Sequence, residues 1–259
     1  MPLRIGFDLD GVLANMEGEL VRQAAVLFGD ATMRGLRERA QDPQPATDAP
    51  GAPAAPSVEV SDDTSGSDDV QAVIAPPVIR LNMTGRQERR LWRHVESIEN
   101  FWETLLEIEP GVVGRLSTIA IDRRWEIMFL TKRPSTCGAT AQVQTQRWLE
   151  SKGFTLPSVF VVQGSRGRIA AALGLDIVVD DRPENCLDVV VDSKARALLV
   201  WRDDEIQLPA AVKRLGIGVI RSVGECLDTL MQVDSARQAQ PGVLDRVMRR
   251  FGLKEPSPS

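Results

Sequence analysis

Histidine and tyrosine are almost missing from this chain of 259 residues, which has one histidine, His94, and no tyrosine. A single histidine excludes a zinc site built from several histidines and an acid–base pair of two histidines. The three cysteines, at positions 137, 186 and 226, are odd in number and widely spaced, so they match neither a disulfide framework nor a CxxC metal motif. We expect reduced and mostly buried thiols, and carboxylates that carry most of the chemistry.

An excess of positive charge is also lacking. The chain has 31 Lys and Arg against 36 Asp and Glu, a formal net charge of −5. Because nucleic-acid affinity depends mainly on cations that contact phosphates, we expect no nucleic-acid polymer as partner. No run of about 18 apolar residues occurs, and two aspartates stand where a signal peptide would need its apolar stretch. The expectation is a cytoplasmic protein without a membrane span.

The composition that is present suits a globular enzyme-sized domain. Hydrophobic residues make up 43% and charged residues 26%, so a sizeable core can be buried, in one large domain or a domain with an insert. Residues 42–77 differ: Pro, Ala, Ser, Gly and acidic residues dominate, and Lys and Arg are absent. Such a segment buries too little surface to offset its ordering entropy, so we predict a disordered linker, with an acidic docking segment as the alternative.

Hydrophobic periodicity predicts an α/β fold. Residues 4–9 read as a short buried strand, followed by a turn through Gly11 and a helix over 14–28. Residues 86–106 have strongly amphipathic spacing, typical of one helix or of two broken near Asn100. Helices then alternate with short β-branched strands, which indicates a parallel sheet covered on both faces, with the site at the carboxyl ends of its strands. The expected strands are 126–130, 158–162, 177–179, 197–201 and 218–220, and the expected helices are 112–122, 140–152 and 167–173.

Polar side chains collect at three of these strand ends. Asp8 and Asp10 are one residue apart, so in an extended chain they point the same way and can share one metal ion or one phosphoryl group. Thr131 ends the second strand, and Asp180 with Asp181 ends another. Hard oxygen ligands favour magnesium. A carboxylate beside this metal can attack phosphorus and form an aspartyl phosphate, while a second carboxylate transfers the protons.

Three strings in this order, FDLDGVLA, FLTKRP and VDDRPEN, resemble the first, second and fourth motifs of the haloacid dehalogenase-like (HAD) phosphohydrolase superfamily. They cover residues 7–14, 129–134 and 179–185, and they are most similar to the 5′(3′)-deoxyribonucleotidase-like branch. The resemblance implies a three-layer α/β/α sandwich with a mainly parallel, Rossmann-like sheet and a small helical cap insert. It also implies a Mg²⁺-dependent phosphatase whose substrate is a small phosphate, such as a nucleotide.

The resemblance further implies roles for individual residues. Asp8 would be the nucleophile, Asp10 the general acid and base, and Thr131 the phosphoryl anchor. The residues expected to bind the metal are Asp8, Asp10, Asp180 and Asp181, and those expected to bind the substrate are Lys132, Gly11 and Trp102. Simpler structural interpretations exist for some of these: Lys132 and its neighbour Arg133 as exposed cations, and Trp102 as part of an apolar packing face.

The third motif departs from the family pattern. The family supplies a lysine near the helix that precedes the acidic pair, but VVQGSRGRIAAALGLD offers only Arg166 and Arg168. Arginine keeps the charge but is bulkier and not interchangeable with lysine. The alternative function is therefore a catalytically weak or inactive HAD-fold module that binds or regulates. Gly164–Gly167 in the same stretch is either a phosphate-cradling turn or a structural one.

The expected domain division follows from these elements. The catalytic core comprises 1–14 and 108–230, the helical cap 15–41 and 78–107, the linker 42–77, and the tail 231–259. Residues of about 242–252 in the tail have the spacing of an amphipathic helix with basic residues around an apolar face. We expect this helix to dock on its own domain or to bind a protein partner.

Overall fold

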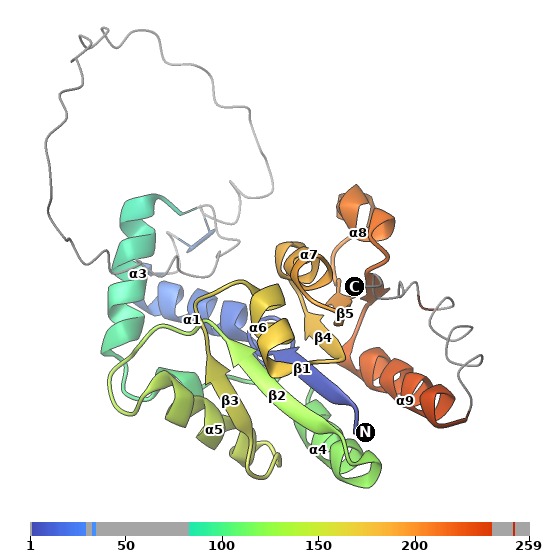
Figure 1. Cartoon of the computed structure of the whole chain (residues 1–259). Helices are drawn as coiled ribbons and strands as arrows, with labels where there is room; N and C mark the ends of the chain where they lie inside the picture. Colours follow the sequence, from blue (N-terminus) through green and yellow to red (C-terminus); the bar gives the residue numbers. More distant parts are fainter. Residues whose placement is uncertain (1, 30–32, 35–82, 240–250, 252–259) are drawn as a thin grey trace, which may run out of the picture.

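A six-stranded parallel sheet forms the centre of the computed structural model, which describes residues 2–29, 33–34, 83–239 and 251 (Figure 1). The strand order is β3-β2-β1-β4-β5-β6. The strands are β1 (Arg4–Asp8), β2 (Glu126–Thr131), β3 (Ser158–Val161), β4 (Ile177–Asp180), β5 (Arg196–Val200) and β6 (Gly218–Ile220). All six strands of the sequence analysis are present, with ends that differ by at most one residue.

Helices connect the strands and cover the sheet. They are α1 (Met16–Phe28), α3 (Gly85–Ser97), η1 (Phe101–Glu103), α4 (Val112–Arg123), α5 (Ala141–Ser151), α6 (Arg166–Leu173), α7 (Pro183–Asp192), η2 (Glu205–Gln207), α8 (Ala210–Arg214) and α9 (Val223–Ala239). Alternate side chains of the strands enter two apolar clusters: Phe129 of β2 joins one and Leu130 the other. Residues of α4, α5 and α9 belong to the first cluster and residues of α6, α7 and α8 to the second. The predicted three-layer α/β/α sandwich is confirmed.

The strand order brings the predicted site residues to one edge. β1 lies between β2 and β4, so the order of strands reverses here, and ligands of such sheets bind outside the carboxyl ends at this point. The register pairs Asp8 with Leu130 and Phe7 with Val179. Asp8, Thr131 and Asp180 therefore end their strands side by side.

The region expected to form the cap contains α1 and α3, which pack against each other (Figure 1). Their apolar faces, with Leu20 and Leu91, join the first cluster of the core. His94 Nε2 lies 3.0 Å from Gln23 Oε1, so this histidine links the two helices. The stretch from 86 to 106 is divided, because Asn100 takes a left-handed backbone with φ of 51° between α3 and η1. This is the second of the two predicted forms.

Two predicted features fall wholly or mostly outside the described residues. The linker 42–77 lies outside them, and so does the tail helix of about 242–252 except for Phe251, which is partly buried against the first cluster. All three cysteines are free: Cys186 and Cys226 are buried, and Cys137 is exposed. None of the helices in the described part of the chain combines the length and apolar character that a membrane span requires.

Candidate active site

Gly11 brings the acidic pair of β1 against the acidic pair of β4. Asp8 is the last residue of β1 and is 7% exposed. Gly11 has φ of 91°, which favours glycine, and a Cβ at this position would lie 2.0 Å from Oδ2 of Asp181. The turn that follows Asp10 and the carboxylate of Asp181 are thus in direct contact, which only a residue without a side chain allows.

Arg166, one of the two arginines in the stretch compared with the third motif, contacts the buried carboxylates. It begins α6, is 2% exposed, and its Nη2 donates hydrogen bonds to Asp8 Oδ1 and, at 3.3 Å, to the Leu130 carbonyl oxygen. Its Nε lies 3.4 Å from Asp180 Oδ2. Arg168, on the same helix, is exposed. Of the two candidate arginines, the structure therefore brings Arg166 to the carboxylates and leaves Arg168 in solvent.

Asp180 and Asp181 differ in how their oxygens are satisfied. Both oxygens of Asp180 accept hydrogen bonds at 3.0 Å from Nδ2 of Asn185, and Oδ1 also accepts one at 2.9 Å from the Arg182 backbone N–H. Asp181 Oδ1 is buried and has no hydrogen-bond partner among the described residues. Asp180 is thus held by the protein, whereas Asp181 presents a free acceptor.

The crowding of buried carboxylates raises their affinity for protons or cations. Burial raises the pKa of Asp8 well above its usual range, and Asp180 raises it further, while Arg166 opposes both effects. Burial and the neighbouring Asp180 raise the pKa of Asp181 to about 7. Burial also raises the pKa of Asp180, although Arg166 and the hydrogen bonds to its oxygens lower it. The cluster therefore has more negative charge than Arg166 alone balances.

Arg133 is a site residue that the sequence analysis missed, because its neighbour Lys132 was named as a substrate-binding residue and Arg133 was considered only as an exposed cation. Lys132 is exposed, but Arg133 is 2% exposed. Its Nη2 and Nε donate to Asp10 Oδ1 and Oδ2 at 2.7 and 2.9 Å, and its Nη1 donates to Thr145 at 2.9 Å. The hydroxyl of Thr131 also donates to Asp10 Oδ2, at 3.2 Å. Asp10 is therefore oriented by two residues of the second motif.

Trp102 does not reach the substrate side of the site, so the expected contact is corrected here. It is 0% exposed, and its Nε1 donates to the Pro134 carbonyl oxygen at 3.0 Å. The guanidinium of Arg133 lies 4.9 Å from the centre of its ring. η1 directs this indole into the core, where it supports Arg133 through packing and a cation–π contact.

A small cavity opens among these groups. Its volume is about 60 Å³, and its lining residues are Asp8, Asp10, Met16, Thr131, Lys132, Arg166, Arg182 and Asn185. Lys132, an expected substrate-binding residue, lies on its wall. Carboxylates, a hydroxyl and cations thus surround one space that is large enough for a phosphoryl-sized group.

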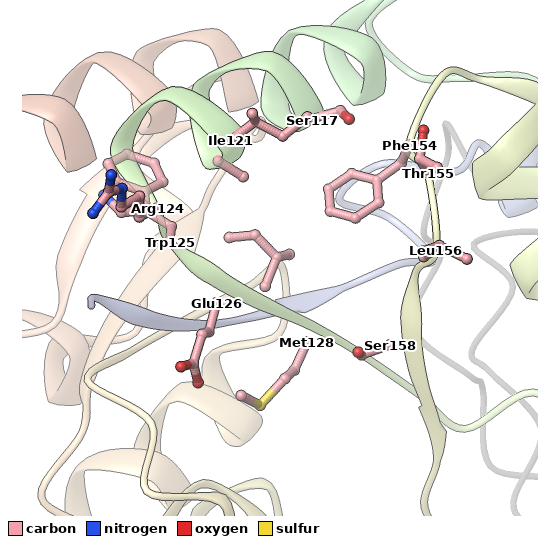
Figure 2. A pocket seen from close by; sticks show the side chains of 12 residues that line it. Ser117, Ile121, Arg124, Trp125, Glu126, Met128, Phe154, Thr155, Leu156 and Ser158 are labelled. Carbon is pink, nitrogen blue, oxygen red and sulfur yellow. The ribbon is translucent and has the colours of Figure 1, made fainter. Parts of the chain in front are cut away.

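A larger cavity, of about 550 Å³, lies at the other end of the strands and contains none of the predicted site residues. It is formed between α4 and the starts of β2 and β3, and Ile121, Phe154 and Leu156 line it (Figure 2). Its charged lining residues are Arg124 and Glu126. This cavity has no acidic cluster and is not the candidate active site.

The glycines of residues 164–167 have different surroundings. A Cβ at Gly167 would lie 2.0 Å from the Asp188 carbonyl oxygen, so this glycine permits close packing of α6 on α7. A Cβ at Gly164 would meet nothing within 4 Å. Ser165 donates to Asp192 at 3.1 Å. These contacts favour a structural turn over a phosphate cradle.

The acidic side chains at the strand ends could hold a magnesium ion only together with water or substrate. In residues 2–29, 33–34 and 83–239, no group of three or more His, Cys, Asp and Glu side chains is arranged to hold a metal ion by itself. Magnesium, however, commonly takes one or two carboxylates together with water and substrate phosphate. The unpartnered Oδ1 of Asp181 and the excess negative charge around Asp8 fit such a two-carboxylate site.

Comparison with known proteins identifies the fold. No family model and no curated protein matches the chain. Among solved structures, a HAD family hydrolase from Deinococcus radiodurans R1, with bound phosphate and sodium, matches with a TM-score of 0.50 and 13% identity over 90% of this chain and 97% of that one. A haloacid dehalogenase-like hydrolase from Xanthomonas campestris matches with a TM-score of 0.46 and 10% identity over 96% and 94% of the two chains. The chain has the fold of the Deinococcus hydrolase.

Proposed function

We propose that this chain is a Mg²⁺-dependent phosphomonoester hydrolase that acts through a phosphorylated Asp8. The observation that carries the proposal is that only one oxygen of the Asp8 carboxylate is hydrogen-bonded within the described part of the chain. Asp8 lies at the point where the strand order reverses. Arg166 holds its Oδ1, whereas Oδ2 accepts no hydrogen bond from any described residue and Asp8 lines the small cavity. A fixed carboxylate with one free oxygen, facing cations, is suited to attack on a phosphoryl group.

Two balanced steps follow from this arrangement. In the first, an oxygen of Asp8 forms a bond to phosphorus, the bond between phosphorus and the leaving oxygen breaks, and Asp10 gives a proton to that oxygen. In the second, Asp10 takes a proton from water, the water oxygen bonds to phosphorus, and the bond to Asp8 breaks to release inorganic phosphate. Thr131 and Lys132 would bind the equatorial phosphoryl oxygens as charge develops there.

Asp8 and Asp181 are the residues that would hold the magnesium ion. The ion would neutralise charge on the phosphoryl group and on the crowded carboxylates. Asp10 and Asp180, also expected among the metal-binding acids, have oxygens engaged by Arg133 and Asn185 and serve in this proposal to transfer protons and to position the site.

The substrate is proposed to be a small phosphate ester that enters between core and cap. In the proposed division, residues 15–41 and 78–107 form the cap, and Met16 at the start of α1 lies on the cavity wall. Closure of the cap over the strand ends would exclude water and strengthen the electrostatic contacts. A nucleoside monophosphate, as in the deoxyribonucleotidase-like branch, is one member of this substrate class.

The test is release of inorganic phosphate from nucleoside monophosphates, sugar phosphates and p-nitrophenyl phosphate. Each substrate is measured with magnesium and with EDTA. Release that requires magnesium supports the proposal, and the ranking of substrates identifies the ester. No release from any substrate by folded protein in magnesium contradicts it.

A second candidate, a HAD-fold module that binds a phosphorylated ligand with little turnover, is favoured by one observation. Arg166 stands in the stretch where the family has a lysine, and its buried guanidinium forms ion pairs with Asp8 and Asp180. An arginine fork that binds the nucleophile too firmly would slow its attack. In this case Arg166→Lys would turn over substrate while the native chain would not.

A further inference from the structure

We propose that Arg202 is a positioning residue of the active site, which acts through the backbone of the turn after Asp10; this rests on the proposed phosphohydrolase function. Arg202 follows the carboxyl end of β5, and β4 lies between β5 and β1. Its Nη1 donates to the Gly11 carbonyl oxygen at 2.6 Å, and its Nη2 donates to the Val12 carbonyl oxygen at 3.3 Å. One side chain therefore reaches past the end of β4 and holds the turn of the first motif.

The turn depends on Arg202 for these two carbonyl groups. Its own backbone hydrogen bonds run from Gly11 N–H to the Ala14 carbonyl oxygen at 3.1 Å, and from the Leu13 and Ala14 N–H groups to the Leu9 carbonyl oxygen at 2.8 Å each. None of these uses the carbonyl oxygens of Gly11 and Val12. Among the described residues, Arg202 is the donor that satisfies both, and the planar fork of arginine can serve two acceptors at once.

Glu109 fixes Arg202 from the other side. Its Oε1 accepts from Arg202 Nη2 at 3.1 Å and from the Val223 N–H at 2.7 Å, and its Oε2 accepts from the Gly224 N–H at 2.9 Å. Burial raises the pKa of Glu109, but the two N–H groups at the start of α9 and Arg202 together hold it below its usual range. The ionised carboxylate is thus anchored to a helix terminus, and it leaves the guanidinium little freedom.

Two groups of the site adjoin the turn. Asp10 stands immediately before it, and the Asp181 carboxylate packs against Gly11 within it. A shift of the turn would therefore displace the proton-transferring carboxylate of Asp10 and change the packing against the metal-side carboxylate of Asp181. Because a displacement of about 1 Å can cost a hundredfold in rate, loss of the Arg202 contacts is expected to lower kcat.

The experiment compares Arg202→Met with Arg115→Met in the full chain. Arg115 is the matched control, because it also pairs across elements, from α4 to Asp228 of α9 at 2.6 Å, but does not contact the turn. Two quantities are measured: amide hydrogen exchange of the peptide that covers residues 9–14, and kcat with KM for phosphate release. For Arg202→Met we expect at least about threefold faster exchange and about a tenfold lower kcat, with partial recovery of kcat in Arg202→Lys.

The outcomes separate this proposal from the proposed function. Unchanged exchange in Arg202→Met, or faster exchange without a fall in kcat, overturns the positioning role. A native chain that releases no phosphate overturns the function, and hydrogen exchange then still decides whether Arg202 holds the turn. If Arg202→Met does not fold, Glu109→Gln is the second variant. The amide oxygen of glutamine can still accept a hydrogen bond from α9, while the negative charge that holds Arg202 is removed. We expect faster exchange of residues 9–14 and a lower kcat in this variant too, each by a smaller factor than in Arg202→Met.

Discussion

Arg133 binds both oxygens of the Asp10 carboxylate through one edge of its guanidinium, at 2.7 Å from Nη2 to Oδ1 and 2.9 Å from Nε to Oδ2. The arginine side chain is 0% exposed, and the aspartate side chain is 13% exposed. The rings of Trp102 and Trp148 flank the guanidinium, at 4.9 and 6.0 Å from its central carbon. Asp10, the proposed proton-transferring residue, is therefore held by the buried Arg133, whose guanidinium packs against two tryptophan rings.

Replacement of this cation should cost both stability and activity. Removal of one partner of a buried ion pair leaves the other uncompensated, so we expect Arg133→Met to lower the free energy of unfolding by about 3 kcal/mol and to lower kcat. Arg147→Met is the control, because Arg147 and Glu103 form an exposed pair at 3.2 Å and its loss should cost under about 1 kcal/mol. Equal losses in urea denaturation for the two variants would contradict this interpretation of Arg133.

Substitutions of Arg166 test whether activity requires only a positive charge at this position or the guanidinium itself. We expect Arg166→Met to abolish phosphate release, because Asp8 and Asp180 would lose their common cation. Arg166→Lys keeps the charge with one donor group and should stay within about tenfold of the native kcat. Arg168→Met, on the exposed side of α6, should leave kcat unchanged. Activity in Arg166→Met, or its loss in Arg168→Met, would reverse the assignment.

The metal-free protein should lose stability as the pH rises, through Asp181. Its folded-state pKa is about 7 against an ordinary value of 3.8, so the folded chain keeps a proton that the unfolded chain releases. The contribution is favourable at low pH and is lost between about pH 4 and about pH 7.

Thermal unfolding in EDTA at several pH values measures this effect. From about pH 5 to about pH 8, Asp181→Asn should gain about 2 kcal/mol relative to the native chain, because the amide does not ionise. Asp122→Asn, an exposed change on α4, is the control and should follow the native chain. A constant difference between Asp181→Asn and the native chain over this range would show that Asp181 does not titrate there.

Two alanine substitutions distinguish a structural turn from a phosphate cradle at residues 164–167. The Cβ of Gly167→Ala would meet the Asp188 carbonyl oxygen, so we expect a loss of at least about 1 kcal/mol in stability. Gly164→Ala has open space and should change neither stability nor KM. A rise in KM for Gly164→Ala at unchanged stability would favour the cradle instead.

The alternation of elements was readable from sequence because the pattern is local. Short β-branched strands and amphipathic helices are defined by a few neighbouring residues, so the sheet and the strand-end carboxylates were predicted correctly. α9, by contrast, was not predicted as an element. Its start at Val223 depends on contacts with Glu109, more than a hundred residues away.

The sequence did not predict which of the charged side chains near the site are buried. Lys132 and Arg133 are adjacent and equally charged, yet one is exposed and the other is buried on Asp10. Arg166 and Arg168 differ in the same way, because residues two positions apart on a helix point to nearly opposite sides of it. A possible signal for Arg133 was its place two residues after Thr131, on the strand-end loop that faces Asp10.

The most direct test of the central claim is phosphate release by Asp8→Asn beside the native chain and Asp122→Asn, in magnesium, with the best substrate of the panel. Asn keeps the size of the side chain but removes the nucleophilic carboxylate. We predict that release disappears in Asp8→Asn, while circular dichroism shows a folded protein, and that it stays at the native rate in Asp122→Asn. Release by Asp8→Asn at the native rate would contradict the phosphorylated Asp8 and, with it, the proposed mechanism.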